Sequence, residues 1–349
     1  MHMADAMISP AVGGAMWAVS AAGIAYCSRK IKNDPDESKV SLMGVLGAFV
    51  FAAQMVNFTI PATGSSGHIG GGMLLAVLLG PHAAFLTIAS VLVVQALFFA
   101  DGGLLALGCN IFNLGFFPAF AAYPLIYRKI MSEDATKTRL SAAVILSAAV
   151  ALQLGAFSVV LQTKASGISE LPFLTFVALM QPIHLAIGIV EGVLTAAVIS
   201  FVWKANPLIL DIPCRKAPEN RIPVKIVAAV LLAATIIIGG FLSRHASDNP
   251  DGLEWAITRS TGKEELESTG NIRKLLASVQ EKISILPGYG FQPAGAAAAP
   301  DSVSPETGTS ISGIVGGSVT LAFVLILGFA LKKVLGRQQD RVSDGPGHG

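Results

Sequence analysis

The chain has 349 residues, of which 53% are hydrophobic and only 13% are charged, with 24 basic and 22 acidic side chains. Soluble domains carry about 25% charged residues, so this composition excludes a soluble globular protein and indicates a multispanning membrane protein. We expect membrane lipid to surround the chain, and the near balance of charge gives no sign of a nucleic-acid partner.

The start of the chain shows no secretory signal, because no basic segment or cleavage site precedes the first apolar run. We therefore expect Met1 to remain the amino terminus. The three cysteines, Cys27, Cys109 and Cys214, form no CxxC pair. They indicate packing residues rather than a disulfide framework or a thiolate metal site.

Apolar runs of roughly 17–25 residues predict spanning helices. They lie at 7–28, 40–58, 84–100, 104–127, 140–163, 174–203, 223–243 and 311–335. A shorter run at 68–80 is not long enough to cross a hydrocarbon core of about 30 Å as a straight helix. We expect it to be a short or partly re-entrant helix that its neighbours shelter. The predicted fold is therefore an all-α polytopic bundle of about seven helices, followed by a two-helix C-terminal unit.

The basic residues indicate an extracytoplasmic amino terminus. If the spans alternate from that start, 17 of the 24 basic residues fall in inner segments, and the short outer loops contain only Lys164. This bias follows the positive-inside rule, which is counted over short loops. It also supports the short run 68–80 as a spanning element, because omitting it would place the later basic loops outside. The expected location is the cytoplasmic membrane of a prokaryote.

The polar, proline-broken stretch 204–222 indicates an inner linker. It divides the chain into a first unit, 1–203, and a second unit, 223–349. The second unit has two predicted spans around a long outer loop, 244–310, and that loop contains the sequence Pro250-Asp251-Gly252-Leu253-Glu254.

The first two residues, Met1 and His2, form a potential chelate. The terminal amine, the His2 amide nitrogen and the His2 ring nitrogen can close two fused rings around one ion, and planar nitrogen sites suit Ni(II) and Cu(II). The predicted orientation places His68 at the same membrane face, where it can supply a fourth nitrogen. The alternative is that His2 is simply an exposed residue at the start of the chain.

Small and polar residues surround His68 in the stretch 57–72. Asn57, Ser65 and Ser66 are candidates to orient the ring or its partner, and Asp101 adds negative charge near the mouth of the site. The alternative is a tight helix-entry turn whose histidine contacts interfacial water.

His184 and Glu191 lie seven residues apart inside one predicted span, hence on one helix face. Ionisable groups at this depth are rare and usually face the bundle interior. Two interpretations remain open: a second metal station or pathway, and a buried polar pair that ties helices together. The chain has no P-loop and no HExxH motif, so it does not hydrolyse ATP through a P-loop.

The start Met1-His2-Met3-Ala4-Asp5-Ala6, the His68 loop and the stretch from His184 to Gly192 resemble the CbiM/NikM family over residues 1–203. This family is the substrate-binding membrane component of energy-coupling factor transporters for nickel and cobalt. The tail, with its 250–254 sequence, resembles the small CbiN/NikN, or PDGLE, accessory subunit. Residues 3–6 depart from the family's usual start, whereas Met1 and His2 match it.

The resemblance implies a helical S-component bundle that captures Ni(II) or Co(II) through Met1, His2 and His68. It also implies a separate membrane coupling protein and a pair of cytoplasmic ATPases, with no permanent cofactor and no enzymatic activity in this chain. The main alternative is a partner-independent secondary transporter or channel for divalent transition metals. A membrane enzyme that uses the metal is a third possibility, but it lacks a nucleophile or base beside the histidines. The sequence does not distinguish nickel from cobalt.

Overall fold

The computed structural model describes residues 2–32, 37–131, 136–168, 171–210, 221–262, 266, 270–291 and 305–343. Met1 and Cys214 lie outside these ranges, whereas Cys27 and Cys109 are buried and free, as expected for packing residues. The chain is 80% helical, which confirms the all-α prediction.

The first part of the chain contains η1 (Asp5–Met7), α1 (Pro10–Lys32), α2 (Glu37–Gln54), β1 (Phe58–Ile60), β2 (Ser65–Gly67), α3 (Gly72–Leu79), α4 (Pro81–Phe98), α5 (Leu107–Ile111), η2 (Phe112–Tyr127), α6 (Arg128–Ile130), α7 (Lys137–Ser166), α8 (Phe173–Ala205) and η3 (Pro207–Ile209). The second part contains α9 (Val224–Gly240), η4 (Leu242–His245), α10 (Gly252–Thr261), α11 (Asn271–Ile283), η5 (Pro287–Tyr289) and α12 (Pro305–Ser343).

Six helices of the described chain are long and apolar enough to cross a membrane: α1, α4, the continuous run α5–η2–α6, α7, α8 and α12. The apolar helices α2 and α9 are shorter. Large apolar side chains such as Leu174, Ile236 and Ile326 remain exposed on these helices, as expected where lipid replaces water around the bundle. The chain is thus a multi-pass membrane protein.

The short helix α3 lies inside the bundle, and all eight of its residues are buried. It packs against α4 and η2. Protein rather than lipid therefore surrounds this short helix, as a helix too short to span the membrane requires. Gly80, with a φ of 77°, turns the chain from α3 directly into α4. The position of α3 matters because its N-terminal end follows His68.

Glycines set the closest helix contacts. A Cβ on Gly188 of α8 would lie 2.8 Å from the Ala149 Cα of α7, and one on Gly192 would lie 2.6 Å from the Ile145 Cα. Because these two residues have no side chain, the α7 and α8 backbones approach closely, as is common at small residues in membrane helix bundles. Gly239 and Gly313 bring α9 and α12 together in the same way, and α12 also packs on α2.

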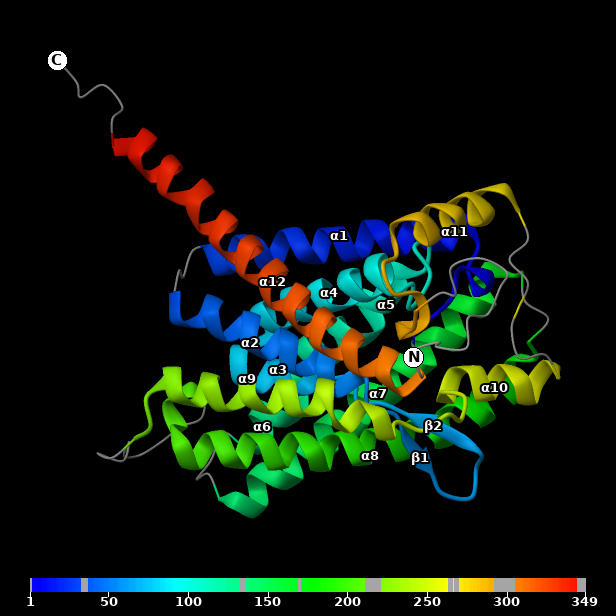
Figure 1. Cartoon of the computed structure of the whole chain (residues 1–349), viewed down its shortest axis with the longest axis horizontal. Helices are drawn as coiled ribbons and strands as arrows, with labels where there is room; N and C mark the ends of the chain where they lie inside the picture. Colours follow the sequence, from blue (N-terminus) through cyan, green and yellow to red (C-terminus); the bar gives the residue numbers. More distant parts are fainter. Residues whose placement is uncertain are drawn as a thin grey trace.

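The hairpin, α10, α11 and the amino terminus gather at one end of the helical bundle (Figure 1). Segments far apart in the sequence therefore meet there. The hairpin is a small antiparallel pair in which Phe58 faces Gly67 and Ile60 faces Ser65. The sequence predicted only a loop at 59–67; paired strands of three residues carry too little alternation to be recognised.

Candidate metal site

The backbone of Met3 is clamped to the bundle by Asn110. The Met3 N–H donates to Asn110 Oδ1 at 2.8 Å, and Asn110 Nδ2 donates to the Met3 carbonyl at 3.2 Å. The Gly103 N–H donates to the same carbonyl at 2.9 Å. Because Met3 is fully buried, this clamp determines where the preceding residue, His2, enters the bundle.

His68 is positioned by the turn that follows it. Glu191 of α8 accepts hydrogen bonds from the N–H groups of Gly70 and Gly71 at 2.8 and 3.0 Å. Gln54 of α2 donates to the Gly70 carbonyl at 2.8 Å. Gly71 has a φ of 76°, which a residue with a Cβ adopts only at a cost. The turn is therefore anchored from two helices.

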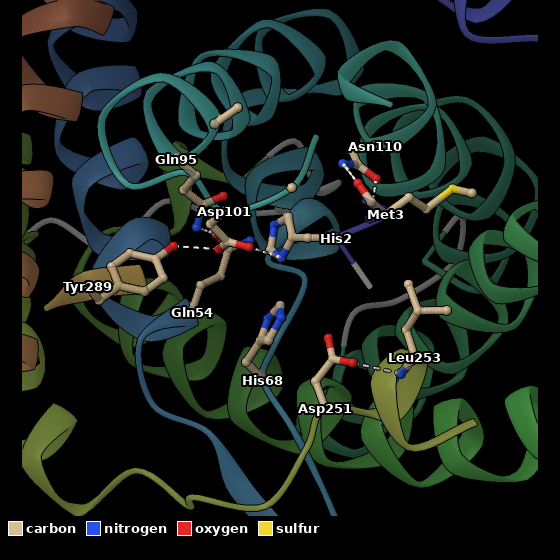
Figure 2. Close-up of polar contacts among 12 residues, drawn as sticks. His2, Met3, Gln54, His68, Gln95, Asp101, Asn110, Asp251, Leu253 and Tyr289 are labelled. Carbon is tan, nitrogen blue, oxygen red and sulfur yellow. Dashed lines mark hydrogen bonds and ion pairs between the residues drawn. The ribbon is translucent and has the colours of Figure 1, made fainter. Parts of the chain in front are cut away.

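The rings of His2 and His68 are stacked, with centroids 5.2 Å apart and an interplanar angle of 19° (Figure 2). His68 Nδ1 donates to the Ile69 carbonyl at 3.0 Å, because a carbonyl can only accept, and Nε2 is left as the unprotonated nitrogen. Burial lowers the pKa of His2, and it lowers the pKa of His68 to about 4. Both rings are thus neutral near pH 7, the form that binds metals.

Asp101 lies next to the rings, with its Oδ1 3.5 Å from His2 Nδ1. The Tyr289 hydroxyl donates to the other carboxylate oxygen (Figure 2), and the Tyr289 ring stacks on Phe99 with centroids 5.1 Å apart. Burial and the Asp101 charge raise the pKa of Tyr289, so the phenol keeps its proton and remains a donor. Tyr289, from the second unit, thereby fixes the carboxylate nearest to His2.

The 247–251 segment lies along the hairpin. The Ser66 N–H donates to the Pro250 carbonyl at 2.8 Å, and the Ser66 hydroxyl donates to the Asn249 carbonyl at 2.7 Å. The Trp255 indole N–H donates to the Thr63 carbonyl at 3.0 Å. These contacts hold residues 247–255 against the strand that leads to His68.

Asp251 caps α10. Its Oδ1 accepts from the N–H groups of Leu253 and Glu254 at 2.7 and 2.8 Å, and the Glu254 carboxylate accepts from the Asp251 N–H at 3.0 Å. This reciprocal arrangement is a capping box. Burial alone would raise the pKa of Asp251, but nearby positive charge and the Glu254 N–H lower it below its ordinary value, so the carboxyl is ionised near pH 7.

A cavity of about 700 Å³ opens at this end of the bundle, lined by residues from both halves of the sequence. His2 and His68 line it together with the carboxylates of Asp5, Asp101, Asp248, Asp251 and Glu254. None of the described residues that line it is lysine or arginine. Negative charges that line a cleft raise the local concentration of cations. The cavity therefore favours the approach of a metal ion to the two rings.

The other predicted site residues have separate partners. The Asn57 carbonyl accepts from the Ser247 N–H, and the Ser65 hydroxyl donates to the Ser66 and Pro250 carbonyls. His184 and Glu191 are each 1% exposed and face the bundle interior, but His184 bonds to the Met180 carbonyl whereas Glu191 holds the His68 turn. Met1, the predicted source of the amine, lies outside the described residues.

Within the described residues, no three His, Cys, Asp or Glu side chains already form a metal-binding group. Two of the four predicted nitrogens belong to the main chain and are not side-chain donors. Gln54, Asn110 and Tyr289 were not singled out for this site from the sequence. A single amide or phenol side chain forms no sequence pattern that would mark it as part of a site. The Asp-x-x-Glu pattern at 251–254, by contrast, is a helix-start signal that predicts the cap of α10.

A crystal structure described as a truncated transition metal transporter matches the fold with a TM-score of 0.52 and 28% sequence identity. The match covers 58% of this chain and 99% of that one. Together with the membrane spans and the paired histidines, this likeness places the chain in the class of transition-metal transport membrane proteins.

Residues 2–209 match the family model described as the cobalt uptake substrate-specific transmembrane region, CbiM, and residues 225–333 match the PDGLE domain. Because the first match covers more than half of the chain, the chain belongs to the CbiM family. It is 29% identical to the putative fused nickel transport protein NikMN of Archaeoglobus fulgidus, over 95% of this chain and 98% of that protein. It is 32% identical to the fused nickel transport protein NikMN of Rhodobacter capsulatus, over 64% of this chain and 67% of that protein. The predicted resemblance to CbiM/NikM fused to a NikN-like unit is confirmed, and membership makes the chain a membrane component of nickel or cobalt transport.

Replacing Gly252 with alanine tests how closely the two units must fit. The new Cβ would lie 2.6 Å from Ile183 Cγ2 and 3.2 Å from His184 Cε1, so α10 must move away from α8. We expect the free energy of unfolding to fall by about 1–3 kcal/mol, seen as a lower thermal midpoint of the purified chain. Gly14→Ala is the matched control, because nothing lies within 4 Å of its Cβ. An unchanged midpoint for Gly252→Ala would show that the close approach is not needed.

Proposed function

We propose that this chain captures Ni(II) or Co(II) from the outer face through the Met1 amine, the amide and ring nitrogens of His2, and the ring of His68. The observation that supports this ligand set most strongly is the stacked pair of neutral rings, 5.2 Å apart, in a cavity lined by carboxylates. Nitrogen donors of this kind suit first-row divalent metals, and planar sets favour Ni(II).

The carboxylates serve a different purpose from the nitrogens in this proposal. Asp101, Asp248 and Glu254 raise the local concentration of hydrated cations at the cavity. Asp101 also lies beside the His2 ring, with its Oδ1 3.5 Å from Nδ1, so its negative charge attracts a cation toward the nitrogen that closes the chelate. Selection among metals then depends on the nitrogen set rather than on charge.

We further propose that the chain divides functionally into the metal-binding unit 1–203, the inner linker 204–222 and the accessory unit 223–349. Residues 211–220 of the linker lie outside the described part of the chain. Contacts from 247–251 to Ser66 and from Tyr289 to Asp101 support a role for the accessory unit in positioning the binding segments. The Arg273 side chain adds a contact to the Ile8 carbonyl at 3.1 Å.

In the same proposal, energy comes from a separate membrane coupling protein and two cytoplasmic ATPases, as in energy-coupling factor transporters. The lack of a P-loop in the sequence supports ATP hydrolysis by a separate protein. The concentration of basic residues in alternate loops supports an amino terminus on the outer side. The archaeal and bacterial relatives support a prokaryotic cytoplasmic membrane.

Uptake of radioactive Ni(II) or Co(II) into liposomes tests this mode of transport. The chain alone is expected to bind metal but not to accumulate it, whereas the chain with its coupling protein and ATPases accumulates it only with ATP. Accumulation by the chain alone at the full rate would contradict the ATP-driven mode and favour the secondary transporter or channel.

A further inference from the structure

His184 has a ring nitrogen without a partner. The side chain is 1% exposed, and its Nδ1 donates to the Met180 carbonyl at 2.8 Å. Because the carbonyl can only accept, the proton is on Nδ1 and the lone pair is on Nε2. Nε2 is buried with no hydrogen-bond partner among the described residues. A buried polar atom left without a hydrogen bond destabilises the fold, so its presence in a folded protein requires a physical reason.

Beside His184 is a cavity of about 10 Å³. The residues that line it are His68, His184 and Asp251, the glycines Gly67, Gly70 and Gly252, and the apolar Leu114, Leu152 and Ile187. This volume is close to that of one water-sized particle. Because His68 and Asp251 also line the large cavity, the small cavity adjoins the candidate capture site.

The donors around this space suit a transition-metal ion. Metal-binding histidines usually donate their second ring N–H to a carbonyl or carboxylate, which is the arrangement that Met180 provides for His184. Asp251 caps α10 through one oxygen and has further interactions; since a carboxylate has about four acceptor positions, it can bind a metal ion without giving up the cap. Imidazole and carboxylate ligands together are compatible with Ni(II) and Co(II).

Close packing brings these groups together. A Cβ on Gly252 would lie 3.2 Å from His184 Cε1, and one on Gly67 would lie 2.5 Å from Ile187 Cγ1. The two glycines thus let α10 and β2 approach α8 closely enough for Asp251 and His184 to share one small space. The accessory unit contributes the carboxylate, and the metal-binding unit contributes the imidazole.

We propose that this cavity is a second, transient station for the transported ion, formed by His184 Nε2 and the Asp251 carboxylate, with His68 lying between the two stations. An ion leaving the amino-terminal chelate exchanges its ligands for His184 and Asp251 as it moves inward. This assignment rests on the proposed capture of Ni(II) or Co(II), and it gives Asp251 a role in transfer in addition to its role in capping α10.

Equilibrium dialysis of the full-length chain against Co(II) alone tests the second station, with a native amino terminus and any affinity tag removed. We expect one tightly and one more weakly bound ion per chain. His184→Ala should keep the tight ion and lose the weak one. Asp251→Asn retains a good N-cap but removes the charge, and it should weaken the second ion by about tenfold or more.

His82→Ala is the matched control, because His82 lies at the start of α4 against Tyr26 and Phe120; it should keep both ions. The proposal is overturned if the native chain binds a single ion up to millimolar Co(II), or if His184→Ala retains the weak ion. If the weak, His184-dependent ion is present but the tight ion is missing, the proposed capture site fails and the second station stands.

Discussion

His2→Ala is expected to lower the affinity of the full-length chain for Ni(II) by about two to three orders of magnitude. Four-ligand metal sites bind with roughly 10–16 kcal/mol, so one lost ligand removes about a quarter of that free energy. The substitution also removes one of the two fused chelate rings, because the imidazole that forms it with the His2 amide nitrogen is lost. Competition titration with a coloured chelator measures the effect.

His245→Ala provides the control for this substitution. His245 is exposed and lies at the same end of the bundle in η4, where its ring contacts Phe241, so its loss should leave the affinity unchanged. A His2→Ala chain that binds Ni(II) within threefold of the parent would remove His2 from the proposed ligand set.

Glu191→Gln is expected to have the second largest effect, although Glu191 does not line the large cavity. Each carboxylate oxygen accepts one backbone N–H, from Gly70 and Gly71. A glutamine presents one oxygen and one NH₂ group, so one buried N–H faces another donor. We expect a loss of about 2–3 kcal/mol in the free energy of unfolding. We also expect an affinity for Ni(II) about 10–100-fold lower, because the His68 turn is no longer held.

Thermal unfolding and Ni(II) titration of the same preparation measure both effects. Thr195→Val is the matched control one turn along α8, since its buried hydroxyl has no partner among the described residues and its removal should be nearly neutral. If Glu191→Gln binds Ni(II) as tightly as the parent, the hydrogen bonds from Gly70 and Gly71 to Glu191 are not needed to position His68.

The architecture was largely predictable because membrane spans leave a strong signal. Each predicted apolar run coincides with a helix, and the run 68–80 was correctly expected to form a short sheltered helix, α3. The sequence did not predict that Phe112–Tyr127 is wound as a π-helix with Pro118 and Pro124 inside it. Proline signals that regular α-helical bonding is interrupted, but not which alternative winding replaces it.

The site was predictable only in part. The residue types at His2 and His68 indicate metal chemistry, but their stacking depends on Asn110 and Glu191, more than 100 residues away from the segments they hold. Such contacts arise from helix packing and leave no local pattern. His184 and Glu191 were expected to share a helix face, and both side chains are buried. Their spacing does not indicate that Glu191 binds the His68 turn while His184 lines a separate cavity.

The most direct test of the account is visible absorption during Ni(II) titration of two chains, one with a free Met1 and one with a Gly-Ser-Gly-Ser extension before it. A single added residue is avoided, because it would place the histidine third and create a different four-nitrogen chelate. Capture by the amino terminus predicts a yellow, planar Ni(II) spectrum that saturates at one ion per native chain and is lost on extension. An octahedral spectrum for the native chain, or the same planar spectrum and affinity for both chains, would contradict capture by the amino terminus.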